Sequence, residues 1–153
     1  MAEIMFYHLE HKPWEQVLPK QLSTALERGW RCVVQAGSEQ RVEAISELLW
    51  KNDADIFLAH GSKADGMAEK QPIWLTAEPE NPNAATVRFF VEGAAVGDLT
   101  GLARAVILFD GRDEAAVATA RTDWKRLKAE GHEISYWQQD ENYRWQNKSK
   151  SAD

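Results

Sequence analysis

Two short apolar runs near the start of the chain are each followed by a segment with helical periodicity, and this alternation constrains the fold most. The runs cover residues 4–9 (IMFYHL) and 31–36 (RCVVQA). Apolar runs of this length are typical of buried strands. An order of strand, helix, strand and helix implies parallel strands joined by right-handed crossovers. The sequence therefore predicts an α/β domain in which these two strands are parallel neighbours.

Residues that favour helix ends set the limits of the first two predicted helices. The first begins at about Pro19, or at about Trp14 with Pro19 as a kink, and Gly29 is suited to the position after its end. Ser38 can cap the second helix, which ends near Trp50. Each helix follows one of the two apolar runs, as the predicted crossovers require.

The remainder of the sequence extends the same architecture. Asp113 can cap a third helix over about residues 114–130, and Gly131 can end it. Further strands are predicted in the runs IWLT, TVRFFVEG, ARAVILFDG and EISYWQ, and IFLAHG is a short strand or an extended segment. We expect one domain over residues 1–142, with a mixed, mostly parallel sheet flanked by helices. Residues 143–153 are expected to form a polar, flexible tail.

Composition fits one compact domain in a reducing compartment. The chain has 153 residues, of which 44% are hydrophobic, enough for a sizeable core. No apolar run approaches the length of about 18 residues that spans a bilayer, and the N-terminus has no basic segment typical of a signal peptide. The single cysteine, Cys32, lies in an apolar run and has no partner for an intrachain disulfide. We expect a cytoplasmic protein without membrane contact.

Charge is distributed unevenly along the chain. The formal net charge is −6, yet residues 121–128 contain four basic residues and one acid. The rest of the chain then holds 14 basic and 23 acidic residues, a net charge of −9. Proteins that grip nucleic acid directly usually have a broad basic surface. An acidic body with one basic spot fits a small acidic ligand better than a duplex.

That basic spot forms a row on the third predicted helix. Arg121, Trp124, Lys125 and Lys128 are spaced so that a helix brings them to one side. In one interpretation Trp124 covers the core while the long cations lie over it. In the other, Trp124 is the floor of a shallow apolar pocket, and the cations hold a ligand with a carboxylate.

Signatures of catalysis and of cofactor binding are absent from the sequence. The first two strand–helix junctions, HLEHKPWEQVLP and QAGSEQR, contain neither a G-x-x-x-x-G-K-[ST] nor a G-x-G-x-x-G phosphate loop. His8 and His11 lie around the end of a strand, where alternation turns them to opposite faces, so they do not indicate a metal site. His60 and Asp110 are acid–base candidates without a supporting residue. We expect no cofactor and no metal.

The order of several short segments resembles a known family. FYHL, LPKQL, ALERG, CVV, ELLW, FLAHG, QPIWL and the block from LFDGRDEAAVATAR to YWQQ occur in the order found in the chi subunit of bacterial DNA polymerase III holoenzyme. The similarity extends from about Ile4 to Trp145. It implies a mononucleotide-binding type of fold without the phosphate loop, and a protein that is not an enzyme.

The resemblance also implies partners. Chi subunits bind the acidic C-terminal tail of single-stranded DNA-binding protein (SSB) and pair with the psi subunit of the clamp loader, and in some bacteria with a helicase-like repair protein. Contact with single-stranded DNA would be indirect. The family's pocket for the tail has an arginine and an aromatic residue one turn apart, followed by a lysine. The corresponding tail site here is Arg121, Trp124 and Lys125, with Lys128 and Trp50 beside them.

The family's partner face, for psi or a helicase-like protein, corresponds to Phe57, Phe109 and Asp110. Ordinary core packing of the two phenylalanines is the alternative for this face. Two other functions stay open for the whole chain. One is an enzyme on a degenerate nucleotide-binding fold, with His60 and Asp110 as acid and base. The other is a direct binder of single-stranded DNA that stacks bases on Trp124.

Overall fold

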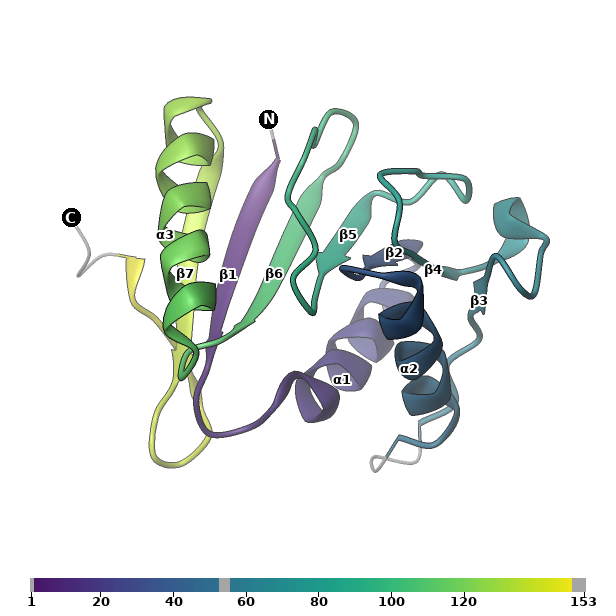
Figure 1. The fold of residues 1–153 in the computed structure, drawn as a ribbon, viewed down its shortest axis with the longest axis horizontal. Coiled ribbons are helices and arrows are strands. Elements are labelled where there is room, and N and C mark those ends of the chain that lie inside the picture. The colour runs from purple at the N-terminus through teal and green to yellow at the C-terminus, as the bar shows by residue number, and fades with distance from the viewer. Residues whose placement is uncertain (1, 53–55, 150–153) are drawn as a thin grey trace.

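The computed structural model describes residues 2–52 and 56–149, and within them one eight-stranded sheet carries three α-helices (Figure 1). The strand order is β3-β4-β2-β5-β6-β1-β7-β8, and all neighbouring pairs are parallel except β7 and β8. The strands are β1 (Glu3–Leu9), β2 (Cys32–Gln35), β3 (Gly61–Ser62), β4 (Ile73–Thr76), β5 (Val87–Phe90), β6 (Arg104–Asp110), β7 (Glu133–Gln139) and β8 (Trp145–Asn147). The helices are α1 (Trp14–Glu27), α2 (Glu39–Trp50) and α3 (Glu114–Ala129), with a short 3-10 helix η1 (Ala68–Lys70).

The α/β class with a mixed, mostly parallel sheet is confirmed, but one predicted pairing is wrong. β1 and β2 run in the same direction without being neighbours, because β5 and β6 lie between them. The two neighbours of β1 are instead β6 and β7, which are as long as β1 itself. β1 and β6 each have seven residues and pair from Glu3↔Arg104 to Leu9↔Asp110, whereas β2, β4 and β5 have four residues each. Pairing strands of equal length leaves few ladder N–H and C=O groups without partners.

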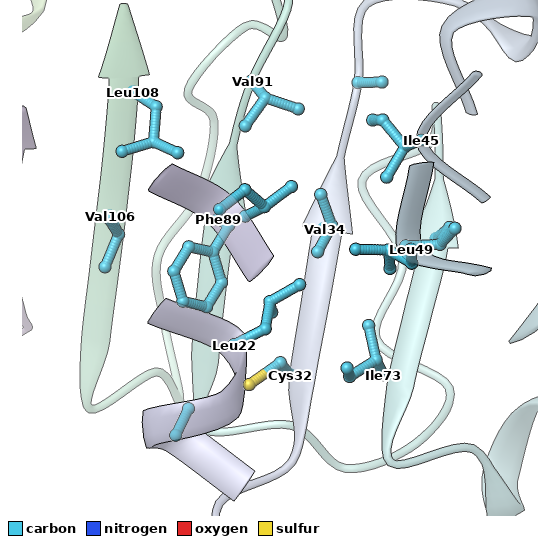
Figure 2. Close-up of a cluster of buried hydrophobic side chains, with 14 of the residues drawn as sticks. Leu22, Cys32, Val34, Ile45, Leu49, Ile73, Phe89, Val91, Val106 and Leu108 are labelled. Carbon is cyan, nitrogen blue, oxygen red and sulfur yellow. The ribbon is translucent and has the colours of Figure 1, made fainter. Parts of the chain in front are cut away.

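The helices cover opposite faces of the sheet. On one face, Leu22 of α1 and Leu49 of α2 pack with Val34 and Phe89 of the central strands (Figure 2). On the other face, Leu127 of α3 is buried in a separate cluster beneath that helix. Alternate residues of a strand point to opposite faces, so β1, β5 and β6 each contribute to both clusters. Side chains carried by α2 and by α3 are thus separated by the sheet.

The free thiol of Cys32 belongs to the cluster under α1 and α2 (Figure 2). Burial raises the pKa of this thiol to about 12. The thiol therefore stays protonated at neutral pH and acts as a small apolar side chain.

Most predicted helix limits are confirmed. α1 has the earlier of its two predicted starts, at Trp14, and contains Pro19. Ser38 caps α2 by accepting a hydrogen bond from the backbone N–H of Arg41 at 3.3 Å. Asp113 caps α3 in the same way, through the N–H groups of its second and third helical residues. Predictions that rest on such local chemistry need no knowledge of the tertiary fold.

The structure differs from the expected C-terminal tail. Part of that tail, Trp145–Asn147, forms β8 and pairs antiparallel with β7, and the Trp145 ring meets Tyr7 edge-on at 4.9 Å. Residues 150–153 of the predicted tail lie outside the described residues. The run IFLAHG contributes only its last glycine to a strand, β3. Among the residues that the structure describes, no helix is long and apolar enough to cross a membrane.

Candidate functional site

The predicted row on α3 lies at the border between a core cluster and solvent. Arg121, Lys125 and Lys128 are exposed, whereas Trp124 is partly buried. The Trp124 ring lies 5.5 Å from the Phe6 ring, between centroids, and packs on the core cluster under α3. We call these four residues of the helix the α3 border. Trp124 therefore covers the core, as the first interpretation of the row has it, and the cations surround it.

Tyr136 of β7 extends the α3 border, and sequence reasoning missed it. Its ring meets the Trp124 ring edge-on, with the centroids 5.8 Å apart. Burial raises the pKa of Tyr136, while the nearby positive charge of Arg121 acts in the opposite direction. The only sequence signal is the predicted strand that contains it, because its position beside α3 depends on the pairing of Phe6 with Tyr136 across β1 and β7. Tyr136 thus contacts Trp124 and lies close enough to Arg121 to be affected by its charge.

Behind Tyr136 lies a short chain of hydrogen bonds. The Tyr136 hydroxyl contacts Nδ1 of His8, and Nε2 of His8 lies 2.8 Å from Oε1 of Glu10. His8 is almost covered, with 11% of its side chain exposed, while Glu10 is open to solvent. Gly111 makes room for the imidazole, since a Cβ at that position would lie 1.9 Å from the ring. His8 is thus held in one orientation by its neighbours.

Phe109 and Asp110 lie near this hydrogen-bonded chain rather than on a separate partner face. Phe109 is 9% exposed, and its ring centroid lies 5.2 Å from that of His8 and 6.2 Å from that of Tyr136. Asp110 is exposed and accepts a hydrogen bond from the backbone N–H of Arg112, which is the main cause of its lowered pKa. For Phe109 the alternative of core packing is therefore the correct one.

Trp50 and Phe57 form an exposed pair, which we call the aromatic patch. Their side chains are 62% and 78% exposed, and the ring centroids are 6.3 Å apart. The Trp50 ring also lies 4.8 Å from that of His60. Core packing is excluded for Phe57 by this exposure. Two aromatic side chains left in water on adjacent segments are typical of surfaces that meet a protein partner.

The structure does not bring Trp50 to the α3 border, so this part of the expected tail site is wrong. α2 packs against β3 and β4, whereas α3 packs against β6 and β7 on the opposite face (Figure 1). For the same reason Phe57 and Phe109 do not share a surface. The expected tail site thus reduces to the α3 border, and the expected partner face divides between two regions.

The acid–base candidates do not meet. His60 is 7% exposed and lies 3.1 Å from Oγ of Ser46 through Nε2 and 2.8 Å from the carbonyl oxygen of Leu58 through Nδ1. These contacts identify a structural histidine. Asp110 lies at the end of β6, four places in the strand order from β3, the short strand that follows His60. Over residues 2–52 and 56–149 no cluster of His, Cys, Asp or Glu has an arrangement that could hold a metal ion.

A crevice of about 740 Å³ lies at the carboxyl ends of β5 and β6, between the first turns of α1 and α3. β1 leads to α1 on one face and β6 leads to α3 on the other, so this is the point at which nucleotide-binding α/β folds hold phosphate. Its acidic lining residues are Glu15, Glu92, Asp110, Asp113 and Asp123, and Arg112 is its basic one. This distribution of charge opposes a phosphate ligand.

Comparison with known proteins gives consistent results. The family model described as "DNA polymerase III chi subunit, HolC" matches residues 1–135. The chain is also similar to the "Probable DNA polymerase III subunit chi" of Rickettsia prowazekii (strain Madrid E), with 28% identity over 87 residues. That alignment covers 57% of this chain and 53% of the relative, so the similarity spans about half of the relative's length. The family match includes the α3 border and the aromatic patch, and it ends one residue before Tyr136.

Proposed function

Because the family match spans most of its length, this chain belongs to the DNA polymerase III chi subunit family, and we propose that it is a non-catalytic adaptor of the replisome. It binds the acidic C-terminal tail of SSB and links SSB to the clamp loader through a psi-like partner. A helicase-like protein is the other partner of this kind. Single-stranded DNA is reached through SSB rather than by direct contact.

The arrangement of the α3 border is the observation that carries this proposal. Three exposed cations, Arg121, Lys125 and Lys128, surround the partly buried ring of Trp124. The SSB tail, in its family form, is acidic and ends in an aromatic residue with a free carboxylate. An arginine fork can bind that carboxylate through two parallel hydrogen bonds, and an aromatic shelf can receive the last ring. The lysines add attraction for the acidic residues that precede it.

The aromatic patch supports a second, independent contact. Trp50 and Phe57 lie on the opposite face of the sheet from the α3 border, so both surfaces can be occupied at once. Burial of two large exposed rings provides the apolar contact expected of a stable subunit interface. We assign this patch to the psi-like or helicase-like partner. Phe109 and Asp110 contribute to the surroundings of the tail site.

The test is a calorimetric titration with an acidic peptide that ends in an aromatic residue with a free carboxylate. Arg121→Ala removes the bidentate partner and should weaken binding by on the order of 2 kcal/mol, or about thirtyfold. Amidating the peptide should have a similar effect. The two changes together should cost little more than either alone, because they remove the same interaction.

Arg41→Ala is a matched control, since Arg41 is an exposed arginine on α2, across the sheet from the α3 border. It should leave the peptide affinity unchanged. Circular dichroism should show that both variants are folded. Unchanged affinity of a folded Arg121→Ala variant would reject the α3 border as the tail site, and absence of binding by the wild type would reject the function.

A further inference from the structure

The chain Glu10–His8–Tyr136 connects the solvent to the edge of the α3 border. Both imidazole nitrogens of His8 are in hydrogen-bond contact, Nδ1 with the Tyr136 hydroxyl and Nε2 with the Glu10 carboxylate. The carboxylate can only accept a hydrogen bond, whereas the hydroxyl can donate or accept. Whether the His8 ring carries one proton or two therefore decides whether the Tyr136 hydroxyl donates or accepts the hydrogen bond between them.

Two protonation states give two different surfaces. In neutral His8 the proton lies on Nε2, because Nε2 must donate to Glu10, and Nδ1 then accepts the proton of the Tyr136 hydroxyl. The hydroxyl oxygen presents only lone pairs to its other neighbours. In protonated His8 both nitrogens donate. Nδ1–H then donates to the Tyr136 oxygen, and the hydroxyl proton is free to donate elsewhere.

The released hydroxyl proton lies beside the group proposed to hold the ligand. Arg121 is close enough to Tyr136 for its charge to affect the phenol, and Trp124 packs edge-on against the same ring. A carboxylate bound by Arg121 with its aromatic side chain on Trp124 would meet the phenol of Tyr136. A hydroxyl that donates to this carboxylate strengthens binding, whereas one that presents lone pairs does not.

We propose that Tyr136 is a specificity-determining residue for a peptide carboxylate, and that protonation of His8 turns its hydroxyl toward that carboxylate. This inference rests on the proposed function, since it concerns the same tail site. It goes beyond it by adding a hydrogen-bond donor that lies outside the residues matched by the family model. It also makes recognition of the tail sensitive to pH between about 5 and 8, where histidine changes charge.

The sign of this dependence follows from the negative charge that the ligand brings close to His8. Glu10, and Asp110 at the end of β6, are the acidic neighbours of the ring. Arg112 beside Asp110 and Arg121 on α3 are the basic residues on that side. A bound carboxylate adds another negative charge and an acceptor for the released hydroxyl. Binding and protonation therefore favour each other, and affinity should rise as the pH falls from 8 to 6.

The experiment measures the affinity of the free-acid peptide at pH 6 and pH 8 in constant salt. At pH 6, Tyr136→Phe should weaken binding about tenfold, the effect expected of a hydrogen bond to a charged group. At pH 8 the same substitution should have almost no effect. His8→Leu should make the affinity independent of pH over this interval. The amidated peptide should show a much smaller dependence on pH, since it lacks the charged acceptor.

Tyr7→Phe is the matched control, because Tyr7 is a partly buried tyrosine of β1 whose side chain faces away from α3, toward the cluster under α1 and α2. It should bind the peptide like the wild type at both pH values. If the wild type binds and Arg121→Ala does not, but Tyr136→Phe is equally harmless at pH 6 and pH 8, the inference is wrong while the proposed function stands. If the wild type does not bind at any pH, both are wrong.

A second measurement needs no substitution and so does not depend on the folding of a variant. Proton NMR follows the His8 ring signals against pH in the wild type, with and without the free-acid peptide. By linkage, the ring in the complex should remain protonated to higher pH than in the free protein. Identical titration curves in the presence of saturating peptide would overturn the inference.

Discussion

The α3 border and the aromatic patch each contain a tryptophan, but the two rings have different environments. Trp124 packs against Phe6 and Tyr136 and is partly buried. Trp50 is 62% exposed and meets only the rings of Phe57 and His60 among the described residues. Trp124 is thus part of the core with one edge at the surface, whereas Trp50 projects from the end of a helix.

The charges around the two rings differ as much as their burial. The α3 border has cations on the same helix face, at Arg121, Lys125 and Lys128. Beside the aromatic patch, Lys51 pairs with Glu47 at 3.1 Å, so the positive charge of this lysine is offset by a carboxylate of its own helix. A partly buried ring among cations is suited to an acidic ligand, and an exposed pair of uncharged rings is suited to an apolar partner. The presence of a tryptophan does not by itself distinguish the α3 border from the aromatic patch.

The largest expected difference between the two regions is in stability. Trp124→Ala leaves a cavity against Phe6 and Tyr136 and should lower the free energy of unfolding by about 3 kcal/mol. Trp50→Ala truncates a side chain that is mostly exposed, so it should change the free energy of unfolding by less than about 0.5 kcal/mol. Urea unfolding followed by far-ultraviolet circular dichroism measures both values. Equal losses in the two variants would contradict the contrast in burial.

The second expected difference is that variants of the two regions lose different binding partners. Phe57→Ala should weaken capture of a psi-like partner by about 1.5 kcal/mol, or roughly tenfold, because it truncates a large ring at the centre of the proposed contact. Its melting temperature should stay within a few degrees of the wild type, since the side chain is 78% exposed. A pull-down with the partner and a titration with the acidic peptide should be run on the same preparation.

Met67→Ala provides the control for this variant, because Met67 is another large apolar side chain that is 60% exposed. It should affect neither ligand. Phe57→Ala should leave the peptide affinity intact, and Arg121→Ala should leave capture of the partner intact. Loss of both ligands in a single folded variant would show that the two surfaces are coupled rather than independent.

The sequence predicted those parts of the fold that depend on local chemistry. Ser38 and Asp113 cap helices where their side chains suggested, because a cap needs only the first turn of its own helix. The order of the strands could not be predicted, since β1 has apolar residues that would fit beside either β2 or β6. β8 was missed because Trp145 is one apolar residue in a polar segment, and its pairing with β7 supplies the rest of its stability.

The same distinction applies to the candidate site. Arg121, Trp124, Lys125 and Lys128 share one helix, so helical spacing was enough to group them. Trp50 was grouped with them wrongly, because its place relative to α3 depends on which face each helix covers. His8 and Tyr136 meet across β1 and β7, more than 120 residues apart in sequence. No periodicity within either strand indicates such a contact.

The smallest expected effect concerns Lys128 of the α3 border, which should contribute less to peptide binding than Arg121. Lys128 is exposed on the last turns of α3, so it should act on the approaching acidic peptide through solvent. Lys128→Ala should cost about 0.5 kcal/mol, roughly twofold in affinity, because exposed ion pairs are weak. Stopped-flow measurements should assign this loss to the association rate, and the loss should disappear as salt is raised to about 1 M, where charges are screened within about 3 Å. Lys51→Ala, at the aromatic patch, should have no effect on the peptide. A loss for Lys128→Ala as large as that for Arg121→Ala, and in the dissociation rate, would instead make Lys128 the residue that holds the carboxylate.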